Sequence, residues 1–288
     1  MEFQKALIGL DILNLLNTAK YQPIIFIPFI ALALLLIFNI LIKKHRDQFF
    51  DTIAGLIIII LFMILSAILL DTIYLSANPE RVIYWSETFM RSDYKLFGTY
   101  PTFWLYKHGF SWVERPIVYT YQYLAFIISL WVIFLAFYKK GAFLSKFIKQ
   151  FFIAFVICFP IWIIFPAISP ADMFLANKFN RPIPETVAIS LNDGPPSRFT
   201  NVSVVRFMRM WAMENKLAIS TFPSMHAIWG MLLAYSIIQI LKKKPYKWFA
   251  ITLATTNIIG TVYIFQHYAV DILAGIAIAI IITKLNLR

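Results

Sequence analysis

The chain has 288 residues, of which 60% are hydrophobic, 17% are aromatic and only 14% are charged. A soluble domain carries about 25% charged residues, so the composition excludes an ordinary soluble globular protein. The sequence contains several apolar runs of about 20 residues, the length that a helix needs to cross a bilayer. Backbone groups in lipid must be hydrogen-bonded within the protein, which favours helices in these runs. We therefore predict an all-α integral membrane protein, a polytopic helical bundle of about six to seven transmembrane helices, with residues 1–288 as a single membrane domain.

The net charge of +12 would raise nucleic acid as a partner if the protein were soluble. Here most lysines and arginines lie in short segments between the apolar runs, which is the distribution that the positive-inside rule describes. We therefore expect the membrane bilayer, and no nucleic acid, as a partner of the chain.

The expected elements follow in chain order. Residues 1–20 have an amphipathic pattern that is too short and too polar to span, which predicts a helix on the membrane surface. The predicted spans are residues 23–42, 52–75, 117–138, 151–168, 222–241, 248–265 and 268–282. Pro160 and Pro166 are expected to kink or end the fourth span. The segment 76–116 is rich in tryptophan and tyrosine, which favours a half-buried hairpin or a surface helix at the membrane interface.

Four short basic segments are nearly free of acids: residues 43–46, 139–149, 242–247 and 284–288. Placing all four in the cytoplasm requires an odd number of spans and an outside N-terminus. The long segments 76–116 and 169–221 then face outward, and so do two histidine motifs at the ends of the last spans.

The second of these motifs holds His267 and Asp271, which are four positions apart at the start of a predicted helix. Residues at this spacing share a helix face, so the carboxylate can accept the Nδ1 proton of the imidazole. The imidazole Nε2 is then left free as a nucleophile or base. An ionisable residue such as Asp271 within an apolar run is by default a candidate for function.

The first motif holds His226, 41 residues earlier, at the start of another predicted helix. One intervening helix would return the chain, so the two histidines are expected near each other at one membrane face. Pro223 and Ser224 fit a helix start, with Ser224 as its cap. A helix N-terminus is also a natural site for a phosphate. Two other uses of these residues remain open: a zinc site, or a proton relay in a transporter or another non-enzymatic membrane protein.

The residues of both motifs resemble the type 2 phosphatidic acid phosphatase superfamily, and within it the branch of inositol phosphorylceramide synthases and their bacterial relatives. Pro223-Ser224-Met225-His226 is similar to the superfamily motif Pro-Ser-x-His, and His267 with Asp271 is similar to its motif His-x-x-x-Asp. The branch-specific pattern Thr-x-Tyr-x-x-x-His-Tyr-x-x-Asp is matched by Thr261, Tyr263, His267, Tyr268 and Asp271. The resemblance covers residues 150–285, which we expect to form the catalytic core.

This resemblance implies a membrane enzyme that acts on a lipid phosphate through a phosphohistidine intermediate. His267 would attack phosphorus, Asp271 would orient His267, and His226 would protonate the leaving alcohol and then activate the incoming water or alcohol. No metal or other cofactor is implied. The acceptor separates a lipid phosphatase from a head-group phosphotransferase, and both remain open. From the resemblance and the charge pattern together we expect the enzyme in a bacterial inner (plasma) membrane, with its active site facing outward.

The residues that would neutralise the phosphate are harder to assign. The phosphatase branch has Ser-Arg where this chain has Gly260 and Thr261. The superfamily motif Lys-x6-Arg-Pro has no clean match, because Lys107 and Arg115-Pro116 are one residue too far apart and lie in the wrong loop for the expected topology. The expected substrate-binding residues are Ser224, Tyr268, Lys178, Arg181, Arg206 and Arg209, and Arg198 is a further basic candidate in the same loop as the last four.

Overall fold

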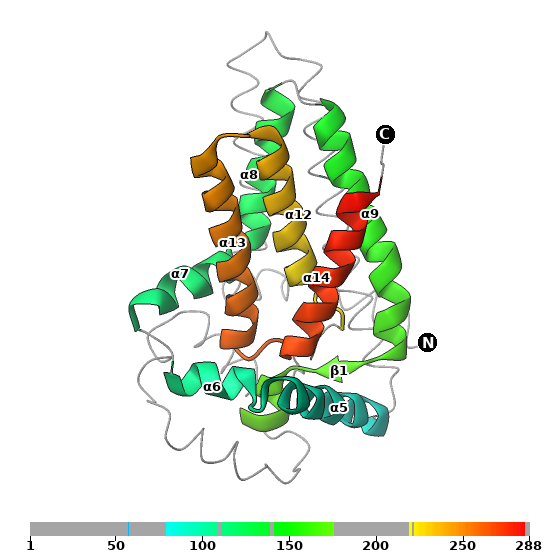
Figure 1. Ribbon diagram of the computed structural model, residues 1–288. Coiled ribbons are helices and arrows are strands. Elements are labelled where there is room, and N and C mark those ends of the chain that lie inside the picture. Colours follow the sequence, from blue (N-terminus) through cyan, green and yellow to red (C-terminus); the bar gives the residue numbers. More distant parts are fainter. Residues whose placement is uncertain are drawn as a thin grey trace, which may run out of the picture. The chain divides into compact units, whose positions relative to one another are not determined.

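The structure, a computed structural model, describes Ile57 and residues 79–108, 111–138, 141–175, 219–220 and 222–285. These residues are almost all helical (Figure 1), which confirms the all-α prediction. The elements are α5 (Pro79–Phe97), α6 (Pro101–His108), α7 (Ser111–Gln122), α8 (Leu124–Phe137), α9 (Gly141–Ile164), β1 (Ala167–Ile168), η3 (Ala171–Leu175), β2 (Ile219–Ser220), α12 (Met225–Ile240), α13 (Lys244–Tyr263) and α14 (Ala269–Lys284). The surface helix predicted for 1–20 and the spans predicted for 23–42 and 52–75 lie outside the described residues.

Within the described residues, Ala142–Ile164 of α9 is long and apolar enough to cross a membrane by itself. Pro116–Gln122 and Leu124–Phe137 meet the same criterion if they are counted together as one broken span, and α12 is apolar but shorter. A total of six to seven transmembrane helices therefore stays a prediction.

The observed helix ends correct several predicted boundaries. The predicted span 117–138 consists of two helices, α7 and α8, which are interrupted at Tyr123. The predicted span 151–168 instead starts at Gly141, and α9 continues through Pro160 to Ile164. The helix ends just ahead of Pro166, whose ring disfavours helical geometry in the preceding residue. The range 76–116, predicted to be a loop with a hairpin or a surface helix, contains α5 and α6.

The chain divides into two compact units, and both histidine motifs belong to the second, which comprises residues 73–124 and 149–287. In the first unit, α8 carries a run of ring contacts in which Phe134 packs on Trp131 at 4.8 Å and on Tyr138 at 4.4 Å between ring centroids. The second unit is the one that builds the candidate site.

Three helices of the second unit, α12, α13 and α14, run alternately up and down beside one another (Figure 1). Since α13 returns the chain, the first residues of α12 and of α14 lie at the same end. The helix α5 lies across this end, and α7 packs against α13. The arrangement brings together segments that are far apart in the sequence.

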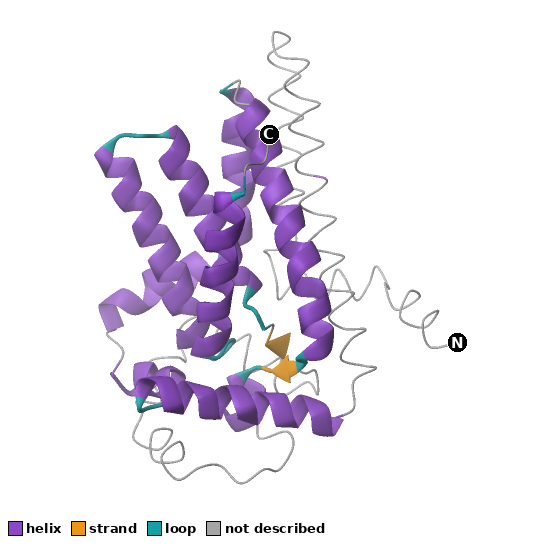
Figure 2. Ribbon diagram, turned by 45° about the vertical axis from the view of Figure 1, so that its right-hand side comes forward, coloured by secondary structure: helices purple, strands orange, loops and turns teal. Residues whose placement is uncertain are grey.

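Two short strands close this end of the unit (Figure 2). β1 pairs antiparallel with β2, with Ala167 opposite Ser220 and Ile168 opposite Ile219. The backbone N–H of Ile168 also donates to the hydroxyl of Ser86 on α5 at 3.0 Å. The strand pair thus fixes the chain that leads into α12.

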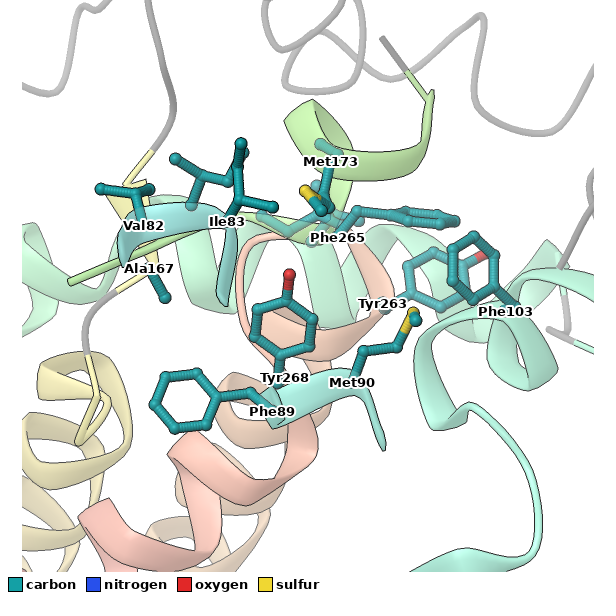
Figure 3. Packing of buried hydrophobic residues seen from close by; sticks show 14 of the residues in the cluster. Val82, Ile83, Phe89, Met90, Phe103, Ala167, Met173, Tyr263, Phe265 and Tyr268 are labelled. Atoms are coloured by element: carbon teal, nitrogen blue, oxygen red, sulfur yellow. The ribbon is translucent and has the colours of Figure 1, made fainter. Parts of the chain in front are cut away.

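A cluster of buried hydrophobic side chains fills the space between α5, β1 and the turn before α14 (Figure 3). Phe89 of α5 stacks on Phe222 with ring centroids 4.6 Å apart, and Phe265 meets Phe103 edge-on at 5.4 Å. Burying aromatic side chains of this size contributes strongly to stability. The cluster therefore joins α5 to both segments that carry the histidines.

Candidate active site

His226 lies in the first turn of α12. Ser224 is the N-cap of this helix, as predicted, and its hydroxyl accepts a hydrogen bond from the N–H of Ala227 at 3.4 Å. Trp162 of α9 donates its indole N–H to the carbonyl of Pro223 at 3.3 Å. The start of α12 is therefore held both by its own cap and by a neighbouring helix.

His267 lies in the turn between α13 and α14. The turn is closed by the carbonyl of Thr261, which accepts from the N–H of Gln266 at 3.1 Å and from that of His267 at 3.2 Å. Phe265 within it has a φ of 62°, a left-handed conformation that is uncommon for a residue other than glycine. The buried Phe265 ring holds this tight turn in place, which leaves His267 just before the first residue of α14.

Asp271, in the first turn of α14, is the partner of His267. Its Oδ2 lies 3.4 Å from Nδ1 of His267 and accepts the N–H of Tyr268 at 3.1 Å. Both side chains are buried, with 3% of His267 and 0% of Asp271 exposed. Because Nδ1 is the nitrogen that faces the carboxylate, Nε2 is the one available to a substrate. Burial also lowers the pKa of His267, which keeps the imidazole neutral and leaves a nitrogen lone pair for attack.

Ser220 is a third member of this group that the sequence did not reveal. Its hydroxyl donates to Oδ2 of Asp271 at 2.6 Å and lies 3.3 Å from Nδ1 of His267. The pairing of β2 with β1 brings Ser220 to this position, and no local motif marks it. Carboxylate, hydroxyl and imidazole thus form one buried hydrogen-bonded group.

The two histidines lie side by side, with ring centroids 5.9 Å apart and planes inclined by 60°. The N–H of Ser224 donates to the carbonyl of Asp271 at 2.9 Å, which ties the start of α12 to the start of α14. Gly275 allows this close approach, since a Cβ there would lie 2.6 Å from the carbonyl oxygen of Ser224. At this separation a single phosphate group can contact both rings.

His226 has its own supports. Tyr121 of α7 stacks on its ring at 4.6 Å between centroids and 29° between planes, and Trp229 packs at 5.9 Å. The amide of Asn257 on α13 donates to the carbonyl of His226 at 2.9 Å. Neither Tyr121 nor Asn257 stood out in the sequence, because each lies within an apolar run whose neighbours are known only from the fold.

The positions where the phosphatase branch has Ser-Arg are occupied by packing contacts in this chain. A Cβ added at Gly260 would lie 2.7 Å from the carbonyl oxygen of Ile117 and 3.0 Å from Cβ of Tyr121, so α7 is in close contact there. Thr261 has 0% of its surface exposed, and its hydroxyl donates to the carbonyl of Ile258 at 2.7 Å. The space that an arginine would need at this point is filled by the protein.

The remaining predicted substrate-binding residues fall into two groups. The side chain of Tyr268 lies in the hydrophobic cluster beside Phe89 (Figure 3), where 2% of the residue is exposed. Lys178, Arg181, Arg198, Arg206 and Arg209 lie outside the described residues. The described part of the chain contains no group of three or more histidine, cysteine, aspartate or glutamate side chains that could hold a metal ion.

Comparison with known proteins places this geometry in a family context. The sequence model of a family described as the PAP2 superfamily matches residues 91–285. A search of curated proteins and a search of solved structures each found no significant match. The matched range begins within α5, so it takes in the end of α5, then α6 and α7, as well as the residues from 150 onward that carry both histidine motifs.

Proposed function

We propose that this chain, which belongs to the PAP2 superfamily, is a membrane enzyme that cleaves or transfers the phosphate-containing head group of a lipid through a phosphohistidine intermediate. The observation that carries this proposal is the separation of 5.9 Å between the His226 and His267 rings, with Asp271 behind His267. Membership of the superfamily supports phosphatase or phosphotransferase chemistry in general, and the two histidines supply the groups that such chemistry needs.

The first step uses His267 as nucleophile and His226 as general acid. The lone pair on Nε2 of His267 forms a bond to phosphorus while the bond from phosphorus to the leaving alcohol oxygen breaks. The negative charge of the bound phosphate favours the protonated form of His226, which gives its proton to that oxygen. Asp271, fixed by Ser220, stabilises the positive charge that develops on His267.

The second step reverses these roles. Neutral His226 takes a proton from the acceptor, whose oxygen attacks phosphorus while the bond from phosphorus to Nε2 of His267 breaks. The acceptor is water in a phosphatase and an alcohol in a phosphotransferase. The two histidines return to the state they had with the substrate bound, His267 neutral and His226 protonated, and we propose that no metal takes part in either step.

The phosphate must be held by positive groups or by N–H donors. The N–H groups of Met225 and His226, which precede the capped N–H of Ala227, have no acceptor within α12. Lys178, Arg181, Arg206 and Arg209 remain our candidates for the charged ligands.

The position of Thr261 supports a member of the synthase-like branch over a phosphatase of the Ser-Arg type. A buried threonine in close-packed surroundings leaves the phosphate to be bound by other elements. We accordingly propose that an alcohol acceptor competes with water at this site. The basic segments 139–149 and 242–247 further support an outward-facing active site in a bacterial inner membrane.

Product analysis tests this function. The purified protein in detergent is incubated with radiolabelled short-chain phosphatidic acid, lysophosphatidic acid and phosphatidylinositol, each with and without inositol or a ceramide analogue as acceptor. We expect release of phosphate or transfer of the labelled head group, unchanged by a chelator. Loss of activity on chelation would instead support the zinc site.

A matched pair of histidine variants completes the test. His267→Ala should abolish product formation, whereas His108→Ala, which removes an exposed histidine at the end of α6, should leave it unchanged. A wild-type protein that forms no product with any probe, but moves protons when reconstituted in vesicles, would favour the proton relay.

A further inference from the structure

The helix α5 contacts both catalytic segments. It lies across the end of the unit at which α12 and α14 begin (Figure 1). Phe89 of α5 stacks on Phe222, which precedes the His226 motif, and lies 6.1 Å from the ring of Tyr268, which follows His267. Figure 3 shows Phe89 and Tyr268 together in the hydrophobic cluster. Because α5 is amphipathic, its polar side chains can also contact these two segments.

One polar side chain of α5 reaches the start of α14. Oδ2 of Asp93 accepts the N–H of Ala269 at 2.9 Å, and Oδ1 accepts the N–H of Val270 at 2.8 Å. The paired residues are 176 and 177 positions apart in the chain. The first N–H groups of a helix are usually satisfied by a neighbouring N-cap residue such as serine or aspartate. Tyr268 stands at the N-cap of α14, so an aspartate from a distant helix supplies the acceptors.

The turn that Asp93 holds is the one that aligns the proposed nucleophile. Ala269 and Val270 lie between His267 and Asp271, so their backbone sets the angle at which the imidazole meets its carboxylate. Both oxygens of Asp93 are engaged, and 2% of the residue is exposed. Burial raises the pKa of Asp93 to about 7, with a smaller contribution from the nearby charge of Asp271. A second acid placed so close to Asp271 is costly, and perturbed acids of this kind concentrate at functional sites.

We propose that Asp93 is a positioning residue that caps α14 from α5 and thereby holds His267 and Asp271 in the geometry of attack. The inference rests on the proposed function. Asp93 acts through the backbone and does not touch the reacting atoms. Its loss should therefore slow the chemical step and leave substrate affinity nearly unchanged.

Replacement by asparagine tests this role, because the side chain keeps its shape but one oxygen becomes an NH2 that cannot accept a backbone N–H. With short-chain phosphatidic acid at pH 8, we expect kcat of Asp93→Asn, per folded enzyme, to fall about 10-fold or more while KM stays within about twofold. Asp93→Glu keeps both acceptors on a longer side chain and should retain more of kcat. Arg91→Gln, at an exposed position on the same helix, should behave as wild type.

Hydrogen exchange of the backbone provides a readout that does not depend on activity. The amides of Ala269 and Val270 should exchange faster in Asp93→Asn than in wild type, and those in the middle of α14 should be unaffected. If Asp93→Asn does not fold in detergent, the comparison of Asp93→Glu with wild type carries the test, with lower kcat and unchanged KM expected.

A wild-type value of kcat in the folded variants, or unchanged exchange at both amides, overturns the positioning role. A wild-type enzyme that converts none of the lipid probes overturns the proposed function instead. In that case the exchange result still decides whether Asp93 holds the start of α14.

Discussion

Ser220 donates its hydroxyl hydrogen to Oδ2 of Asp271 over 2.6 Å, although the two residues are 51 positions apart. The same oxygen of Asp271 faces Nδ1 of His267. Ser220→Ala should therefore lower kcat about 10- to 100-fold, because a hydrogen bond to a charged group contributes about 1.5 to 3 kcal/mol. Steady-state kinetics with short-chain phosphatidic acid measure this loss.

The matched control is Ser129→Ala. Ser129 is a buried serine of α8 whose hydroxyl donates to the carbonyl of Ala125 at 2.9 Å within its own helix. We expect its kcat to stay within about twofold of wild type, since a serine hydroxyl that bonds back to its own helix adds little to stability. An equal loss in both variants would assign the effect to general loosening of the protein.

Gly275 is the point of closest contact between α14 and α12. In Gly275→Ala the new Cβ would lie 2.6 Å from the carbonyl oxygen of Ser224 and 3.1 Å from Cβ of Ala227. Overpacking of this kind costs about 1 to 3 kcal/mol, and it should also move His226 away from His267. We expect a lower melting temperature in detergent together with a loss of kcat. Leu273→Ala removes an exposed side chain of the same helix, and an equally large loss of kcat there would contradict the role of the contact.

Thr261 tests why this chain lacks the arginine of the phosphatase branch. Thr261→Arg should destabilise the protein and abolish activity, because the side chain is fully buried and an unpaired buried charge costs several kcal/mol. Thr261→Val keeps the shape, loses the bond to Ile258, and should retain kcat within about threefold of wild type. An active, stable Thr261→Arg protein with tighter phosphate binding would show that the space is open to a phosphate ligand.

The ionisation of Asp93 should make stability depend on pH. Burial raises its pKa from an ordinary value of 3.8 to about 7. The negative charge of Asp271 adds to this rise, whereas the hydrogen bonds from the N–H groups of Ala269 and Val270 oppose it. The folded state thus binds a proton more tightly than the unfolded state between these two values. The associated stability is fully present below pH 3.8 and is lost as the pH rises to about 7.

Thermal melts of wild type and Asp93→Asn between pH 4.5 and 8 measure this contribution, because asparagine stays neutral throughout. The wild-type melting temperature should fall relative to that of the variant as the pH rises towards about 7, and the difference should then level off. Parallel curves for the two proteins across this range would show that the pKa of Asp93 is not raised.

The helices that carry the histidines could be predicted because apolar runs and local start signals mark them. The predicted spans 222–241, 248–265 and 268–282 lie close to α12, α13 and α14. Ser224 was identified as a cap because N-caps have a local sequence signal. The spacing of His267 and Asp271 predicted their contact, but His267 lies in the turn before α14 and not on the helix itself.

The supports of the site could not be predicted, because they depend on contacts between distant segments. Ser220 is brought to Asp271 only by the pairing of two-residue strands, and Asp93 reaches α14 from a helix that looked like an interfacial segment. The interruption of the predicted span 117–138 at Tyr123 was also missed. It matters because α7, which ends at this interruption, carries Tyr121 to His226.

Covalent labelling of His267 tests the proposed chemistry most directly. An aryl phosphate with an acidic leaving group needs no proton from His226, so His226→Ala should form the intermediate with it but be unable to activate water for its breakdown. After brief incubation with the radiolabelled ester, we expect an acid-labile phosphate bound to this variant and mapped by mass spectrometry to His267. The double variant His226→Ala/His267→Ala should bind none. Label that persists in the absence of His267, or turnover by His267→Ala at the wild-type rate, would contradict the phosphohistidine mechanism.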